Sequence, residues 1–254
     1  MKGARLDERV VALGLADSRS LAQALIRAGR VLVDDVPVDK PGTRVADAAA
    51  VRVRGETRRF VSRGGEKLAG ALADLGVDPA GLRALDLGAS TGGFTDCLLQ
   101  HGATHVTAVD VGYGQLDLGL RRDPRVQVAE RTNARDLDAS HLPGPIDLVV
   151  VDVSFISSTL VLEPLRALCP GATLLVMVKP QFEVGREKVG KGGVVRDDGD
   201  RLAAVERVAA FAAGLGWRER GRAESRLAGP KGNREVFLLL RPAEAARPRS
   251  VGLA

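Results

Sequence analysis

The amino-acid sequence predicts an α/β protein: a doubly wound sheet with helices on both faces, preceded by a small α+β domain. Three observations lead to this prediction. Short apolar runs suited to buried parallel strands recur from residue 82 to residue 240, with helical patterns between them. Residues 82–111 read as strand, glycine-rich loop, helix and strand, which is half of a nucleotide-binding βαβ unit. Residues 1–54 instead hold two short helical patterns followed by short strands.

The composition is that of a chain that buries a sizeable core without spanning a membrane. It has 254 residues, 45% of them hydrophobic, and no apolar run of 18 residues or more. The first ten residues are charged and lack the apolar segment of a signal peptide. The two cysteines, Cys97 and Cys169, do not have metal-ligand spacing. We therefore expect a cytoplasmic protein that does not span a membrane. We also expect it to be a monomer.

The net charge of +5 lies entirely in the first quarter of the sequence. Residues 1–63 contain 13 Lys and Arg against 8 Asp and Glu, whereas residues 64–254 contain 24 of each. A local basic excess suggests a polyanionic partner such as nucleic acid. The alternative is a solvated surface that happens to be basic.

The first 54 residues carry the pattern of a small RNA-binding domain. A helical pattern covers residues 5–15, and a second helix begins near Ser20, which matches a capping box with Gln23. Strands are expected at 30–33, 36–38 and 51–54. The order R-L-D, S-R-x-x-A-x-x-x-I and G-x-V-x-V resembles the S4 domain. That resemblance implies RNA contact through Arg5, Arg19, Arg27 and Arg30. The alternative is a helical cap on the larger domain.

Residues 55–61 are short and polar, and we expect them to form a linker. Within it, Phe60 is either a packing anchor between the two domains or an RNA-stacking residue. Ser62 is placed to cap a helix over residues 66–75. Lys67 then lies in the first turn, where the helix dipole disfavours a cation. Violations of a local rule of this kind tend to occur at functional sites.

The glycine-rich loop after the strand at 84–87 is the main candidate ligand site. Gly88, Gly92 and Gly93 allow a sharp turn and a close approach of the backbone to a ligand. The dinucleotide fingerprint needs a glycine where this loop has Ser90. The pattern D-x-G-x-x-x-G-G, followed by Asp110 after the next strand, resembles the first motif of S-adenosylmethionine (SAM) methyltransferases. Another nucleotide ligand and a purely structural turn remain alternatives.

Charged residues follow the later strands at the end where ligands bind in open α/β sheets. The strand at 126–128 leads into a polar turn with Asn133, and the strand at 146–152 ends at Asp152. A helix follows at 157–168. The strand at 172–178 is followed by Lys179. A buried charge is costly unless it is paired, so Asp152 is the expected partner of Lys179.

The last third of the chain supplies a loop and two further elements. Residues 183–199 are rich in charge and glycine and are expected to form a mobile loop over the site, or else a solvated insertion without a role. A helix is expected at 202–215. Glu235 opens a strand at 234–240. The tail, 242–254, is expected to be disordered.

Four of these residues, Lys67, Asp152, Lys179 and Glu235, match in order the tetrad of FtsJ/RrmJ-like RNA 2′-O-methyltransferases. Together with the S4-like start, longer stretches resemble the TlyA family, the so-called haemolysin A proteins. These stretches are SRGGEKL, GASTGGFTDCLL, VDVGYGQL, ERTNAR, DVSFIS, VKPQFEVGRE and KGGVVRD. The resemblance runs from about Arg5 to Leu240.

The resemblance implies SAM-dependent methylation of a cytidine ribose 2′-hydroxyl in ribosomal RNA, with the large ribosomal subunit favoured and no metal required. It implies an S4-like RNA-binding domain at 1–54, the linker at 55–61, and a Rossmann-like FtsJ methyltransferase domain at 62–241. Lys179 is then the group nearest the hydroxyl, and Asp152 and Glu235 orient the two lysines. The alternative for the tetrad is a buried structural ion network.

The same resemblance implies the ligand contacts. Cofactor-binding residues would be Gly88, Ala89, Ser90, Gly92, Gly93, Phe94, Asp110, Val111, Asn133 and Ala134. Asp110 would hold the ribose hydroxyls of SAM, and Asp86 would support its methionine end indirectly. Arg63 would join the RNA-binding arginines. Phe155 would stack on a flipped-out cytosine or on adenine, or else pack in the core.

Three other classes of function remain alternatives. The first is a pore-forming haemolysin, which the family label suggests and the lack of an apolar span disfavours. The second is a non-catalytic RNA-binding or ribosome-assembly protein, which the intact tetrad disfavours. The third is a small-molecule methyltransferase or an NAD enzyme. The S4-like start and the missing middle glycine argue against this third class.

Overall fold

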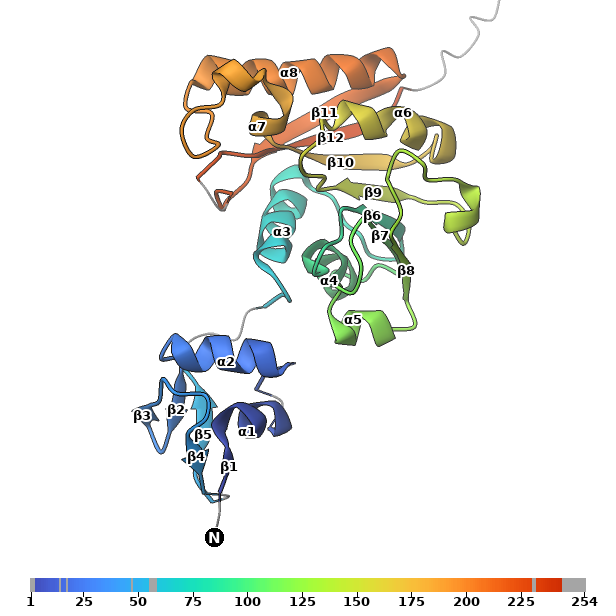
Figure 1. The fold of residues 1–254 in the computed structure, drawn as a ribbon. Helices are drawn as coiled ribbons and strands as arrows, with labels where there is room; N and C mark the ends of the chain where they lie inside the picture. The colour runs from blue at the N-terminus through green and yellow to red at the C-terminus, as the bar shows by residue number, and fades with distance from the viewer. Residues whose placement is uncertain are drawn as a thin grey trace, which may run out of the picture. The chain divides into compact units, whose positions relative to one another are not determined.

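The computed structural model describes residues 3–13, 15–16, 18–46, 48–54, 59–229 and 232–243. The chain divides into two compact units, Met1–Arg58 and Arg59–Ala254, called here the N-terminal and the C-terminal unit. Figure 1 shows the fold of each unit. Residues 55–58 of the expected linker and residues 244–254 of the expected tail lie outside the described residues.

The N-terminal unit packs two helices against short strands. The helices are α1 (Leu6–Ala12) and α2 (Arg19–Arg27), and the strands are β1 (Ala4–Arg5), β2 (Val31–Val33), β3 (Val36–Pro37), β4 (Arg44–Val45) and β5 (Val51–Val53). β2 pairs antiparallel with both β3 and β5, while β1 pairs antiparallel with β4. The apolar faces of the two helices pack against β2, so Leu6, Ile26 and Val31 are fully buried.

Two features of this unit differ from expectation. The N-cap of α2 is Ser18, whose Oγ accepts a hydrogen bond of 3.2 Å from the amide of Leu21. The predicted capping box of Ser20 and Gln23 is therefore wrong, because Gln23 points to Asp7 instead. The pairing of β1 with β4 was not predicted, since two-residue strands are too short to show a period in the sequence.

The C-terminal unit contains a seven-stranded sheet in the order β11-β12-β10-β9-β6-β7-β8. Its strands are β6 (Arg83–Leu87), β7 (His105–Asp110), β8 (Val126–Glu130), β9 (Leu148–Val151), β10 (Thr173–Val178), β11 (Trp217–Glu224) and β12 (Val236–Pro242). β6 to β10 are parallel, and β12 runs antiparallel between β10 and β11. The chain winds from β6 outward through β7 and β8, then returns to place β9 on the other side of β6. This switch point is where a ligand pocket forms in open α/β sheets.

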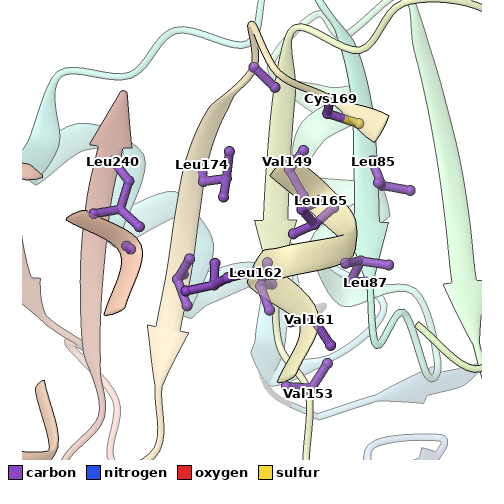
Figure 2. Close-up of a cluster of buried hydrophobic side chains, with 14 of the residues drawn as sticks. Leu85, Leu87, Val149, Val153, Val161, Leu162, Leu165, Cys169, Leu174 and Leu240 are labelled. Carbon is purple, nitrogen blue, oxygen red and sulfur yellow. The ribbon is translucent and has the colours of Figure 1, made fainter. Parts of the chain in front are cut away.

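Helices cover both faces of the sheet, as predicted (Figure 1). They are α3 (Arg63–Leu75), α4 (Gly93–Gln100), α5 (Leu118–Arg122), α6 (Thr159–Leu168), α7 (Pro180–Glu183) and α8 (Asp198–Gly214). Strand residues alternate between two buried apolar clusters, one on each face. Figure 2 shows one of them, in which Val161, Leu162 and Leu165 of α6 lie over side chains of the central strands.

Several elements of this unit begin elsewhere than predicted or were missed. α8 begins at Asp198 rather than residue 202, with Asp197 as its N-cap, so the expected loop at 183–199 is shorter. That loop contains a 3-10 turn at Arg186–Lys188 and a bridge between Gly190 and Val194. The edge strand β11 was missed because only its first residue, Trp217, is buried. Phe60 is buried among apolar residues of this unit itself, so its ring is not exposed for RNA stacking.

Candidate functional site

A pocket of about 430 Å³ opens at the carboxyl ends of β6, β7, β9 and β10. Its floor is the turn after β6, where Gly88 has a φ of 89°. A Cβ at this position would lie 2.6 Å from the backbone oxygen of Asp152, so both the conformation and the close approach require glycine. The lining residues are Gly88, Ser90, Val109, Asp110, Val111, Gly112, Gln115, Thr132, Asn133, Ala134, Asp152, Val153, Ser154, Phe155, Ile156 and Lys179.

Asp110 ends β7 and fixes the shape of one wall of the pocket. Its Oδ2 accepts a hydrogen bond of 2.8 Å from the amide of Ser90, and its Oδ1 accepts one of 2.6 Å from the amide of Gly112. Each carboxylate oxygen has two lone pairs, so each retains the capacity to accept a second hydrogen bond from a ligand hydroxyl. The carboxylate therefore ties the glycine loop to the turn after β7 and still faces the pocket.

Asp86 is fully buried beneath the same loop. Its Oδ2 accepts a hydrogen bond of 2.7 Å from Thr95 Oγ1, while its Oδ1 has no hydrogen-bond partner among the residues that the structure describes. Burial raises the pKa of Asp86 to about 7, and the nearby charges of Asp152 and Asp110 contribute to the increase. In the folded chain the carboxyl is consequently protonated mainly below about pH 7.

Lys179 and Asp152 form an ion pair where β10 and β9 end. Lys179 Nζ lies 2.5 Å from Asp152 Oδ1, which confirms the predicted pairing. The same ammonium donates a hydrogen bond of 2.7 Å to Ser154 Oγ and lies 3.5 Å from the backbone oxygen of Asp152. Three oxygen acceptors thus hold a lysine that is 8% exposed and lines the pocket.

Lys67 and Glu235 form a second ion pair, more deeply buried than the first. α3 begins at Arg63 rather than at residue 66, so Lys67 is its fifth residue and the predicted position in the first turn is wrong. Glu235 immediately precedes β12. Neither residue is among the described residues that line the pocket, but the charges of both shift the pKa of Asp152. Burial raises the pKa of Asp152, the cations of Lys179 and Lys67 oppose this, and Glu235 adds to it. The structure therefore brings the four residues of the tetrad into one electrostatic group.

Phe155 lines the pocket and is 89% exposed. Its backbone has a φ of 68°, in the left-handed region that an aromatic residue rarely occupies. Its ring lies against Phe182, with 5.4 Å between the ring centroids. Such exposure rules out the core-packing alternative for Phe155. A strained backbone here holds an aromatic surface at the pocket in contact with solvent.

Four of the expected cofactor residues are not among the described residues that line the pocket. Ala89 and Phe94 are buried in the apolar core, where Phe94 packs against Phe237. A Cβ at Gly92 would clash with a methyl group of Leu120, and a Cβ at Gly93 would clash with Ser62 Oγ. These residues shape the loop through packing. The expected Gly88, Ser90, Asp110, Val111, Asn133 and Ala134 all line the pocket.

Sequence reasoning missed several lining residues, of which Ser154 has the clearest role because it holds Lys179. The others are Val109, Gly112, Gln115, Thr132, Val153 and Ile156. Most of them directly follow a predicted strand or neighbour a residue that was singled out. The signal that would have found them is therefore their position at the carboxyl end of the sheet.

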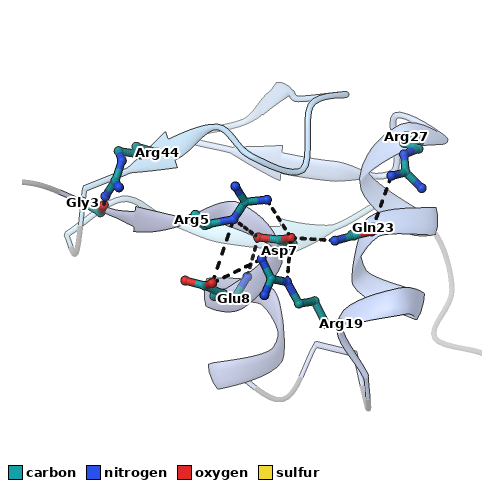
Figure 3. Close-up of polar contacts among 8 residues, drawn as sticks. All are labelled: Gly3, Arg5, Asp7, Glu8, Arg19, Gln23, Arg27 and Arg44. Carbon is teal, nitrogen blue, oxygen red and sulfur yellow. Dashed lines mark hydrogen bonds and ion pairs between the residues drawn. The ribbon is translucent and has the colours of Figure 1, made fainter.

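The arginines expected to bind RNA include a cluster on the N-terminal unit (Figure 3). The fully buried carboxylate of Asp7 accepts hydrogen bonds of 3.0 Å from the Nε atoms of both Arg5 and Arg19, and one of 2.8 Å from Gln23. These partners, with Arg5 foremost, hold the pKa of Asp7 well below its usual range. The two guanidinium groups are 39% and 53% exposed, so two cations share one buried anion.

The remaining expected RNA-binding arginines do not bind Asp7 directly, although Arg27 joins the cluster through Gln23. Arg27 donates a hydrogen bond of 3.4 Å to Gln23, and Arg30 donates one of 3.1 Å to the backbone oxygen of Arg54. Arg63, in the C-terminal unit, donates one of 3.2 Å to the backbone oxygen of Ala228.

The described part of the chain holds no cluster of three or more potential metal ligands. No helix within it is long and apolar enough to cross a bilayer.

The chain matches two family models, the S4 domain over residues 4–49 and the FtsJ-like methyltransferase over residues 60–242. It is 52% identical over 240 residues to the 16S/23S rRNA (cytidine-2′-O)-methyltransferase TlyA of Mycobacterium tuberculosis, covering 94% of this chain and 90% of that protein. It is 36% identical over 179 residues to the 23S rRNA (cytidine-2′-O)-methyltransferase TlyA of Campylobacter jejuni, covering 70% and 69%. A solved structure described as "Putative hemolysin from Streptococcus thermophilus" is 38% identical, with a TM-score of 0.73, and covers 96% of this chain and 90% of that one.

Proposed function

The chain belongs to the TlyA family of FtsJ-like methyltransferases, and from this premise we propose that it transfers a methyl group from SAM to a cytidine ribose 2′-hydroxyl in ribosomal RNA. The observation that carries the proposal is the placement of Lys179, held by Asp152 and Ser154, on the wall of the pocket that Asp110 and Gly88 also line. This arrangement puts a candidate hydroxyl-orienting cation beside a candidate nucleotide site.

The residues around the pocket fit SAM. The absence of a side chain at Gly88 lets the loop after β6 pack against the backbone of Asp152, so the loop and the end of β9 line the same pocket. Asp110 would accept hydrogen bonds from the ribose hydroxyls, Asn133 and Ala134 would lie along the adenine, and the turn at Gly88 and Ser90 would face the amino-acid end. When bound, SAM supplies a methyl group activated by its positively charged sulfur.

Lys179 is the group that we place against the substrate hydroxyl. Its ammonium would donate a hydrogen bond that points a lone pair of the ribose oxygen at the methyl carbon and would stabilise the negative charge that develops on that oxygen. The hydroxyl proton released on methylation would pass to solvent water. Asp152 and Ser154 hold the ammonium in that position. The buried pair of Lys67 and Glu235 would contribute by shifting the pKa of Asp152, the partner of Lys179.

We assign RNA recognition to both units. The S4-like domain at 1–54 would contact the phosphate backbone through Arg5, Arg19, Arg27 and Arg30, and the methyltransferase domain at 62–241 would contribute Arg63, with 55–61 as the linker. Phe155 would stack on the flipped cytosine, which its exposure at the pocket supports. We further propose that the protein acts as a cytoplasmic monomer and needs no metal.

We propose the large ribosomal subunit as the substrate. Both methyltransferase relatives described above have 23S rRNA in their names, whereas 16S rRNA is in the name of only one of them. The 23S reaction is therefore the one that these two relatives share.

The test is transfer of labelled methyl from SAM to purified 30S and 50S subunits taken from a strain that lacks this gene. The wild type, Lys179→Ala and the exposed control Lys191→Ala are assayed side by side. We expect label on a cytidine ribose of 50S subunits with the wild type and the control, and at least about a hundredfold lower rate with Lys179→Ala. No label on either subunit from a preparation that binds SAM would refute the proposal. Label on 30S subunits would correct the choice of subunit.

A further inference from the structure

Two loops that are separate in sequence build the reactive side of the pocket. The first, residues 152–158, follows β9 and carries Asp152, Ser154 and Phe155. The second, residues 179–183, follows β10 and forms α7. On the pocket side they meet through Lys179, which contacts Asp152 and Ser154, and through the aromatic pair of Phe155 and Phe182. These contacts are made through side chains, which can rotate. A further restraint between the loops would therefore determine how well the two loops are aligned.

Glu183 supplies that restraint from behind the pocket. It is the last residue of α7, and its side chain is fully buried. Its Oε1 accepts a hydrogen bond of 2.7 Å from the amide of Ser158, and its Oε2 accepts one of 2.6 Å from Ser157 Oγ. Both donors lie 25 or 26 positions away, at the end of the first loop. One carboxylate therefore joins the end of one loop to the end of the other.

The chemistry of this contact makes it rigid. A buried carboxylate is stable only when hydrogen bonds or cations replace its lost water. Here a backbone amide and a hydroxyl replace it, and the guanidinium of Arg207 on α8 lies 3.6 Å from Oε2. The amide of Ser158, just before α6, cannot rotate away as a side chain can. Moving either loop would thus leave a buried charge without its partners.

We propose that Glu183 is a positioning residue that fixes the loop at 152–158 to the loop at 179–183 and thereby aligns Lys179, Asp152 and Phe155 for methyl transfer. Because this inference rests on the proposed function, its test includes a measurement that does not depend on activity. Glu183 acts through the loops it joins, since it is not among the described residues that line the pocket.

The experiment compares Glu183→Ala and Glu183→Gln with Glu163→Gln, a matched change at an exposed position of α6. Hydrogen exchange followed by mass spectrometry reports the two loops, calorimetry reports SAM affinity, and methyl transfer to 50S subunits reports kcat and KM. We expect Glu183→Ala to speed exchange in peptides covering 152–158 and 179–184 only. We expect its kcat to fall at least about tenfold while SAM affinity changes less than about threefold.

Glu183→Gln should lose less activity than the alanine variant, because its amide oxygen can still accept from Ser158. The proposal is overturned if exchange in the two loops is unchanged, or if protection falls equally throughout the C-terminal unit. It is also overturned if kcat is unaffected while the loops loosen. If Glu183→Ala does not fold, Ser157→Ala removes one of the two contacts and is judged by the same outcomes. A wild type without methyl transfer would refute the proposed function, whereas the exchange result would still decide whether Glu183 joins the loops.

Discussion

Lys67, the fifth residue of α3, forms a buried ion pair with Glu235, which lies 168 positions later and immediately precedes β12. The pair explains how a lysine is accommodated in the interior, because the carboxylate of Glu235 offsets the loss of hydration of the ammonium.

Breaking this pair on one side should destabilise the protein. Lys67→Met leaves Glu235 as an uncompensated buried charge, so we expect the free energy of unfolding to fall by about 3 kcal/mol. Urea denaturation of the C-terminal unit within the intact protein measures this. The double variant Lys67→Met with Glu235→Gln should recover most of that loss and remain inactive. If Lys67→Met alone were as stable as the wild type, the pair would contribute nothing to folding.

Asp86 should make stability depend on pH in the direction opposite to a salt-bridged carboxylate. Its pKa rises from 3.8 to about 7 on folding, so between these values the unfolded chain releases a proton that the folded chain retains. The free energy of unfolding therefore falls as pH rises from about 4 to 7, by an amount on the order of 4 kcal/mol. Below pH 4 both states are protonated and the effect vanishes.

Asp86→Asn tests this prediction, because an amide cannot ionise but can still accept from Thr95. We expect the variant to gain stability relative to the wild type as pH is raised from 5 to 8, measured by urea denaturation at each pH. Asp78→Asn, at an exposed position, is the control and should show no such trend. A stability difference between Asp86→Asn and the wild type that is constant over this range would contradict the assignment.

Gly88→Ala should impair both folding and SAM binding. The new methyl group would lie 2.6 Å from the backbone oxygen of Asp152, and φ is 89°. Gly76→Ala is a matched control, since its φ is 61° and nothing lies within 4 Å of the added Cβ. We expect the control to lose only about 1 kcal/mol of stability and to bind SAM normally. Calorimetric SAM titration of the two variants separates the clash from the backbone effect. Equal SAM affinity in both would show that the close approach is unimportant.

Asp7→Asn should weaken RNA binding although Asp7 itself carries the wrong charge for RNA. The buried carboxylate holds the guanidinium groups of Arg5 and Arg19 in place, and an amide would accept fewer of their hydrogen bonds. We expect a several-fold loss of affinity for 50S subunits, measured by filter binding. Asp35→Asn, which changes an exposed partner of Arg52, serves as the control. Tighter binding by Asp7→Asn would show that removal of negative charge outweighs the loss of order.

The sheet and the reactive side of the site were predictable because both depend on local pattern. Apolar runs ending in Asp110, Asp152 and Lys179 place those side chains at the carboxyl edge of a parallel sheet, and the structure brings all three to one pocket. The pairing of Lys179 with Asp152 followed from the cost of burying an unpaired charge.

Other features depend on contacts that no local pattern reveals. Glu183 sits in a stretch that reads as a charged loop, and its partners lie on a different loop. In the sequence, Asp7 resembles an ordinary carboxylate at the start of a helix. In the structure, Arg19 and Gln23 of α2 donate hydrogen bonds to it. Most residues of the edge strand β11 are charged, so its sequence lacks an apolar face. At Gly92 and Phe94 the residue type is constrained by packing within the protein as well as by any ligand, because Gly92 lies against Leu120 and Phe94 is in the apolar core.

The position of β12 has a consequence for the order in which the protein is made. This strand is the last of the sheet in sequence but lies inside it, between β10 and β11, and it runs antiparallel to β10. Its first residues therefore stand at the edge where β10 ends, which is how Glu235 reaches the tetrad. A growing polypeptide that has emerged only as far as α8 has a sheet that ends at β10, and Lys67 lacks its partner Glu235. Completion of the site must wait until Glu235 and β12 have been translated, so synthesis itself delays the onset of activity.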